Sequence, residues 1–265
     1  MLQCKRGGVL EENFKTIYDE LDDISDWAKL NPGEIQYMRY PTNVIFAALK
    51  IVDIYYTLCI ARVNLHFLDN KDFGDYAKDE LAIKFVKSMH IQNSLIFYNI
   101  AVDYSWQVLW LFYNKWLNQE TPTSDLYEYA IEGCNYQELL LGLTLVQDYK
   151  MRDLIVKPFF DRNTAYQAIR PMYNYLKHRG TFYFDGLGTN RSKMWFGFNK
   201  NGTKVDLPLV TRKEMDVKHT KKLLLQFDKD FVRYMSILIS AVIPSNFCST
   251  TISMTEWING LLNKY

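Results

Sequence analysis

The chain has 265 residues, of which 48% are hydrophobic and 23% are charged. This composition excludes a disordered, collagen-like or low-complexity protein. A formal net charge of +1 excludes binding to nucleic acid or to an anionic membrane through whole-protein charge, so only a local basic patch could serve that purpose. Glycine (12) and proline (7) are scarce, which favours long helices over a many-stranded sandwich or barrel.

The cysteines and the N-terminus predict a cytoplasmic protein. No C-x-x-C motif joins the four scattered cysteines, Cys4, Cys59, Cys134 and Cys248, so a reducing compartment is expected. The opening segment MLQCKRGGVLEE has no apolar signal core. Residues 95–113 come closest to a membrane span, but they carry an Asp, an Asn and a Gln. A polar or charged group at mid-membrane is expensive, so we expect a buried helix of a soluble bundle and no membrane contact.

The first part of the chain is predicted to be helical throughout. Hydrophobic residues at spacings of three and four predict an amphipathic helix over 9–28. Pro41 and the polar residues after it predict the start of a second helix, which runs to about Phe67. A third helical region is expected over about 76–118, with a break near His90.

Shorter elements follow, with helices predicted over 124–131, 135–148, 150–158 and 161–179, a long helix over about 213–243 and a last helix over 254–264. Gly180 is placed as a C-terminal cap. Between these helices, β-type runs separated by Asp-Gly and Asn-Gly turn signals predict a small hairpin or three-stranded insertion over 181–210. The predicted fold is mainly α, an up-and-down helical bundle with this β insertion, in a single domain over 1–265.

One polar stripe lies on the predicted helix around residues 91–117. Asn99, Asp103 and Gln107 recur every four residues in an otherwise apolar segment, so they share one helix face. An acid buried there requires a partner, because an unpaired buried charge is very costly. Arg170 is the candidate partner for Asp103.

A second stripe is formed by Arg170, Asn174 and His178, which also recur every four residues. Arginine grips phosphate with a planar fork, histidine moves protons near neutral pH, and asparagine can orient either group. This set suits a phosphodiester substrate such as RNA. Three alternatives stand beside this interpretation. The basic residues before Gly180 complement the helix dipole, Arg170 only neutralises Asp103 in the core as a structural ion pair, or Pro171 begins a new helix and interrupts the stripe.

Other patterns give weaker signals. The candidate basic rim for nucleic acid consists of Lys218, His219, Lys221 and Lys222 with Arg191 and Lys193; its alternative is an ordinary exposed helix start. The many aromatic residues are expected in the core rather than as base-stacking platforms. The four histidines share no ligand spacing, so no metal site is expected, and no cofactor motif is found.

The second stripe and its context resemble a known family. The segment from Arg170 through Asn174 to Lys177-His178-Arg179-Gly180, with Phe97-Tyr98-Asn99 and Asp103-Tyr104-Ser105-Trp106 upstream, resembles the HEPN superfamily, and within it stand-alone bacterial HEPN-like proteins. The resemblance covers the helices from about 42 to 243. It implies a bundle of four or five helices that forms a homodimer, with the motif helices facing across the dimer cleft. It also implies metal-independent ribonuclease activity and a place in toxin–antitoxin or anti-phage systems.

The resemblance also implies roles for individual residues. Asn174 matches the polar position of the family motif and His178 its histidine. His178 is then the general acid or base, Asn174 orients the substrate, and Arg170 stabilises the scissile phosphate. The arginine usually stands directly before the polar residue, where this chain has Tyr173; Arg170 lies one turn earlier.

Three further residues complete the predicted site. Lys177 and Arg179 are expected to contact the RNA backbone, and Asp103 is expected to hold Arg170. The alternative function is a catalytically inactive HEPN-like module that binds a nucleotide or a partner protein. An exposed stripe that opens onto a cleft would favour the ribonuclease, and a stripe sealed in the core would favour the inactive module.

Overall fold

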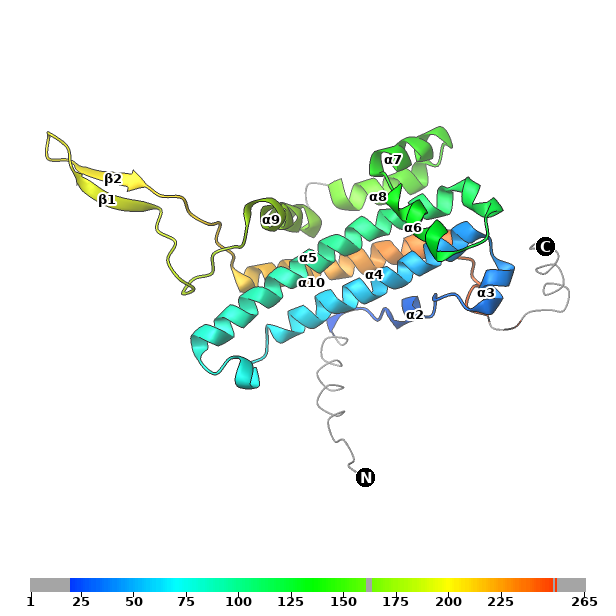
Figure 1. Cartoon of the computed structure of the whole chain (residues 1–265), viewed down its shortest axis with the longest axis horizontal. Coiled ribbons are helices and arrows are strands. Elements are labelled where there is room, and N and C mark those ends of the chain that lie inside the picture. The colour runs from blue at the N-terminus through cyan, green and yellow to red at the C-terminus, as the bar shows by residue number, and fades with distance from the viewer. Residues whose placement is uncertain (1–19, 161–163, 250, 252–265) are drawn as a thin grey trace, which may run out of the picture.

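The computed structural model describes residues 20–160, 164–249 and 251 and is mainly helical, with one small antiparallel sheet (Figure 1). The helices are α2 (Ser25–Ala28), α3 (Glu34–Arg39), α4 (Thr42–Phe67), α5 (Glu80–Tyr113), α6 (Ser124–Glu132), α7 (Tyr136–Leu145), α8 (Tyr149–Phe160), α9 (Ala165–Arg179) and α10 (Val217–Val242). Two 3-10 helices, η1 (Gly74–Tyr76) and η2 (Lys115–Gln119), and two strands, β1 (Lys193–Phe198) and β2 (Lys204–Pro208), complete the described elements.

Side-chain caps begin several of these helices. The side chains of Asp79, Thr123, Asn135 and Asp216 accept hydrogen bonds from backbone N–H groups in the first turns of α5, α6, α7 and α10. Each cap satisfies a donor that the helix leaves unpaired. Loss of one such side chain typically costs about 1 kcal/mol of stability.

The long helices α4 and α5 form an antiparallel pair. Asn43, at the start of α4, donates its side-chain N–H to the carbonyl of Phe112, near the end of α5, at 2.6 Å. At the other end of the pair the ring of Phe67 stacks on His90, with centroids 4.9 Å apart. The short connection between the helices passes through η1.

Contacts with α5 fix the directions of α9 and α10. Arg170 in α9 lies beside Asp103, whereas Phe182, just after α9, donates its backbone N–H to Gln92. Helix α9 therefore runs antiparallel to α5, and α10 runs parallel to α5, as Figure 1 shows. The helices α4, α5, α9 and α10 thus alternate in direction along the chain, with α6 to α8 packed at one end.

Helix α4 is, among the described residues, the one helix long and apolar enough to cross a membrane. Within its most apolar window, 67% of the residues are buried inside the protein, and Ile45, Ile51 and Leu58 are fully buried. Its apolar composition is therefore that of a central helix in the core of the bundle. Residues 95–113, whose sequence comes closest to that of a membrane span, lie in α5.

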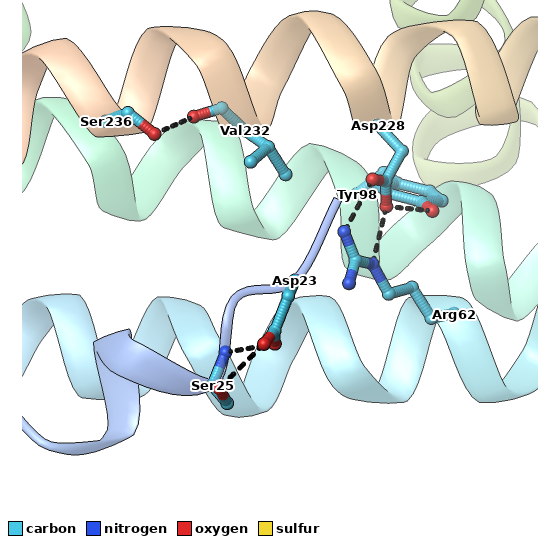
Figure 2. A network of polar contacts seen from close by, with 7 residues as sticks. All are labelled: Asp23, Ser25, Arg62, Tyr98, Asp228, Val232 and Ser236. Carbon is cyan, nitrogen blue, oxygen red and sulfur yellow. Dashed lines mark hydrogen bonds and ion pairs between the residues drawn. The ribbon is translucent and has the colours of Figure 1, made fainter. Parts of the chain in front are cut away.

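A buried ion pair joins the three long core helices. Arg62 in α4 donates two hydrogen bonds to Asp228 in α10, and Tyr98 in α5 donates a third to the same carboxylate, as Figure 2 shows. Burial, together with the adjacent carboxylate, raises the pKa of Tyr98 well above its usual value, so the phenol keeps the proton that it donates.

Several sequence predictions are confirmed by these elements. Helix α4 begins and ends where it was predicted, and α6, α7, α8 and α10 match the predicted helices to within a few residues. The β insertion over 181–210 is a two-stranded hairpin. The predicted first β-run contributes only an isolated bridge between Tyr183 and Glu214.

Other predictions are wrong. The helix expected over 9–28 is interrupted, because residues 21–24 are not helical and the side chain of Asp23 instead accepts hydrogen bonds from Ser25; its first part, residues 9–19, lies outside the described residues. The short helix α3 was not predicted. No break occurs near His90, since α5 is continuous there. The helix expected over 254–264 lies outside the described residues.

Candidate functional site

Helix α9 carries the predicted stripe without interruption. Pro171 lies inside the helix rather than at its start, so Arg170, Asn174 and His178 stay on one helical face. The helix ends as the sequence predicts: Gly180 has a φ of 114°, a positive value that favours glycine, and its N–H bonds to the carbonyl of Tyr175. Asn174 and His178 are exposed, and Arg170 is half-buried.

The exposed stripe faces an open groove of about 920 Å³ between α9 and residues 211–213. We call it the cationic groove, and its polar lining includes Arg170, Asn174, His178, Arg179, Arg212 and Lys213. No carboxylate is found among the described residues that line it. The groove therefore concentrates positive charge in a chain whose overall charge is close to zero, which is the arrangement that attracts an anion.

Residues 211–213 were not predicted as part of the site. Their position is fixed by long-range contacts: the backbone N–H of Lys213 donates to the hydroxyl of Tyr175 at 2.9 Å. The side chain of Asn190 holds the backbone of Arg212 from both sides, accepting from its N–H at 2.9 Å and donating to its carbonyl at 2.8 Å. The adjacent basic residues Arg212 and Lys213 were the available sequence signal.

Arg170 is positioned by contacts with the polar stripe on α5. Its Nη1 donates long hydrogen bonds of 3.4 Å to Asn99 and to Asp103. The guanidinium also lies over the ring of Tyr173, 5.1 Å from the ring centroid, a distance suited to a cation–π contact. Tyr173 thus supports Arg170. Only Nη1 is engaged in these hydrogen bonds, so other guanidinium N–H groups remain for a ligand.

The predicted pairing of Asp103 and Arg170 is therefore present. Burial raises the pKa of Asp103, while the charges of Arg170 and Lys177 oppose the rise. The ion pair is partly solvated, since about a third of each side chain is exposed. Tyr166 lines the groove next to Arg170, and burial raises its pKa to about 12, so its phenol is neutral at physiological pH.

The structure brings most of the predicted site residues together. Arg170, Asn174, His178 and Arg179 line the cationic groove, and Asp103 lies behind Arg170. Lys177 is exposed on α9 but does not line the groove.

The candidate basic rim is placed elsewhere. None of its six residues lines the cationic groove. Lys221 pairs with Asp69, just after α4, at 2.6 Å, and Lys193 pairs with Asp206 in the hairpin at 3.1 Å. In the part of the chain that the structure describes, no group of three His, Cys, Asp or Glu residues is placed to hold a metal ion.

An apolar groove of about 590 Å³ adjoins the cationic groove, and Arg212 lines both. It lies between the first half of α5 and residues 181–188. Leu81, Phe85 and Met89 are exposed along it, so α5 presents an uncovered apolar face beside the candidate site.

No protein-family model, curated protein or solved structure matches the chain. The function of the cationic groove therefore follows from its own geometry and chemistry.

Proposed function

We propose that the protein is a HEPN-like ribonuclease that binds RNA in the cationic groove and cleaves it with His178, acting as a homodimer. The observation that carries this proposal is the composition of the groove: guanidinium, imidazole and amide groups converge on one open space, and no carboxylate is present in its described lining. Backbone phosphates are the ligand that such a surface favours. The exposed stripe on α9 is the arrangement that the ribonuclease requires.

Each side chain then has a role that its position supports. Arg170 binds the scissile phosphate through the N–H groups that Asn99 and Asp103 leave free, and its orientation is set by those two residues. Arg212 binds the same strand from the opposite wall of the groove. Asn174, between Arg170 and His178 on the helix face, orients the reacting group.

His178 supplies the proton transfer. Its imidazole accepts the proton of the ribose 2′ hydroxyl, the 2′ oxygen bonds to phosphorus, and the bond from phosphorus to the 5′ oxygen breaks. The leaving 5′ oxygen takes up one proton, either from the same imidazole or from that of a second copy. The products are a 2′,3′-cyclic phosphate and a 5′ hydroxyl, so atoms and charge balance with no added water or cofactor.

The homodimer is supported by the apolar groove. Uncovered apolar surface of this kind marks an interaction site, and Arg212 joins it to the cationic groove. A second copy seated there would bring two α9 stripes close together. We expect Phe85→Glu to shift the mass measured by light scattering from dimer to monomer, and an unchanged mass would contradict this interface.

A second candidate function is an inactive module that binds RNA or a nucleotide without cleaving it. One observation favours it: Arg170 already bonds to Asn99 and Asp103, as in an arginine kept for structure. The two functions share the groove and differ only in the role of His178.

The experiment that separates them is incubation of total RNA, in the presence of EDTA, with the wild type, His178→Ala and His219→Ala. His219 is an exposed histidine outside the groove, so its variant is the matched control. We expect cleavage by the wild type and by His219→Ala, and its loss in His178→Ala.

If all three proteins bind RNA and none of them cleaves it, the inactive module is the remaining function. Equal cleavage by all three would remove His178 from the reaction. Neither binding nor cleavage by the wild type would overturn the proposed function.

A further inference from the structure

The β hairpin extends away from the helices, as Figure 1 shows, and it carries large aromatic side chains in the open. The exposed fractions of Trp195, Phe196 and Phe198 are 57%, 71% and 68%. The sequence placed such residues in the core, so that expectation is wrong here. An isolated two-stranded hairpin is only marginally stable in water, and aromatic rings this exposed bury little apolar surface that could stabilise it. This surface points to a ligand.

A β-bulge places Trp195 and Phe198 on one face of the hairpin. Trp195 lies opposite Asp206, but Gly197 lies opposite Val205, so Phe196 is the extra residue of the bulge. In a regular strand residues 195 and 198 would point to opposite faces. Here their rings lie together, with centroids 6.0 Å apart and planes at 71°.

Register places lysines on the same face as these rings. Lys204 lies directly opposite Phe198, and Lys193 lies two residues before Trp195. We call Lys193, Trp195, Phe198 and Lys204 the aromatic face of the hairpin. The aliphatic side chains of Met194, Val205 and Leu207 lie on the other face.

The hairpin is positively charged. Between residues 190 and 208 there is a single acid, Asp206, and there are four cations, Arg191, Lys193, Lys200 and Lys204. Asp206 is paired with Lys193 at 3.1 Å. Cations interleaved with exposed aromatic rings are the chemistry of a platform for single-stranded nucleic acid, in which bases stack and phosphates meet lysines.

The hairpin is continuous with the cationic groove. The backbone N–H of Leu209, just after β2, donates to Ser192 at 2.8 Å, and Asn190, just before β1, holds the backbone of Arg212. Both ends of the hairpin are therefore anchored at the wall of the groove. A bound strand leaving the groove past Arg212 would meet the base of the hairpin within about 20 Å, the reach of a few extended residues.

We propose that the aromatic face binds the unpaired bases of a single-stranded RNA whose backbone enters the cationic groove. This inference rests on the proposed function and names its substrate class. A base stacks on the open side of Trp195 or Phe198, and Lys193 and Lys204 bind the flanking phosphates. Paired bases are stacked inside a duplex and present no free face to the rings, so single-stranded RNA is preferred over double-stranded RNA.

The test compares binding of an oligouridylate of about 15 nucleotides to the full-length wild type, Trp195→Ala, Phe198→Ala and Leu207→Ala. Leu207 is exposed on the opposite face and is the matched control. We expect each aromatic variant to bind about 5- to 150-fold more weakly, and Leu207→Ala to bind as the wild type does. Binding of a duplex of the same length is expected to be equal in all four.

A second measurement does not depend on how the variants fold. Ultraviolet crosslinking of the same oligouridylate to the wild type, followed by peptide mapping, is expected to mark residues 193–204 as well as α9. Crosslinks confined to α9 and residues 211–213 would overturn the proposal.

The outcomes also separate this inference from the proposed function. If Arg212→Glu weakens binding and both aromatic variants bind as the wild type does, the hairpin proposal fails and the groove remains. If the aromatic variants change the oligomeric mass of the protein in solution but not its affinity for RNA, the hairpin is a protein interface and the proposal is overturned. If the wild type binds no RNA, both proposals fail together.

Discussion

Arg62 and Asp228 form a two-pronged ion pair inside the bundle. Nε of Arg62 lies 2.9 Å from one carboxylate oxygen of Asp228, and Nη2 lies 2.7 Å from the other. Both residues are buried, and Tyr98 donates to the same carboxylate at 2.7 Å. Although burial by itself would lower the pKa of Arg62, the hydrogen bond and the charge of Asp228 raise it. The contact therefore ties α4, α5 and α10 together at one point, as Figure 2 shows.

Removing one partner of this pair is expected to be strongly destabilising. Arg62→Met leaves the Asp228 carboxylate buried without its counter-ion, which should lower the free energy of unfolding by about 3–5 kcal/mol. The double variant Arg62→Met with Asp228→Leu should lie much closer to the wild type, because no charge is left buried. Guanidinium chloride denaturation measures the free energy of unfolding of both variants. A double variant less stable than Arg62→Met would contradict this explanation.

Residues 211–213, which form one wall of the cationic groove, are expected to affect the salt dependence of RNA binding. The double variant Arg212→Gln with Lys213→Gln removes two phosphate contacts from the cationic groove, so the slope of log binding constant against log salt should become shallower by about 1.4. The control is Lys218→Gln with Lys222→Gln, which removes the same charge from exposed positions outside the groove. Titration of single-stranded RNA at several salt concentrations gives the slopes. Equal slopes in the two variants would place the RNA elsewhere.

The parts of the fold that the sequence predicted are those decided locally. Helix α4 could be placed because Pro41 precedes it and most of its residues are apolar. The break predicted near His90 failed for a tertiary reason: the imidazole stacks on Phe67 and on Phe73, and it bonds to Asn64 at 2.8 Å. A polar residue in α5 is thereby accommodated without disturbing the helix.

The same distinction holds for the candidate site. The stripe on α9 was predictable because its residues lie on one helix at a fixed spacing. The opposite wall was not, because Lys213 reaches Tyr175 across 38 residues of sequence. The bulge that gathers Trp195 and Phe198 on one face of the hairpin likewise depends on strand register, which the alternation of residue types does not reveal.

Asp103 limits the positive charge available at Arg170. We expect Asp103→Asn to bind RNA about 2- to 10-fold more tightly at low salt, because it removes a negative charge next to the phosphate site. The difference from the wild type should shrink as the pH falls, since burial raises the pKa of Asp103 and the wild-type carboxylate becomes neutral at a higher pH than usual. Glu132→Gln, which removes an exposed acid on α6, is the control. Weaker binding by Asp103→Asn would show instead that its charge is needed to position Arg170.

His90 is expected to make stability depend on pH. Burial lowers its pKa from the usual 6.5, so between the two values the unfolded chain holds a proton that the folded chain has released. The free energy of unfolding must then rise with pH up to about 6.5 and fall as the medium becomes more acidic than that. Urea denaturation of the wild type and His90→Gln over this range measures the effect. The variant should lose this part of the pH dependence, whereas His219→Gln, at an exposed position on α10, should keep it. A wild type whose stability increases as the pH falls through this window, with no pH dependence in His90→Gln, would contradict this prediction. It would mean that the folded protein favours the charged imidazole, although burial lowers the pKa of His90.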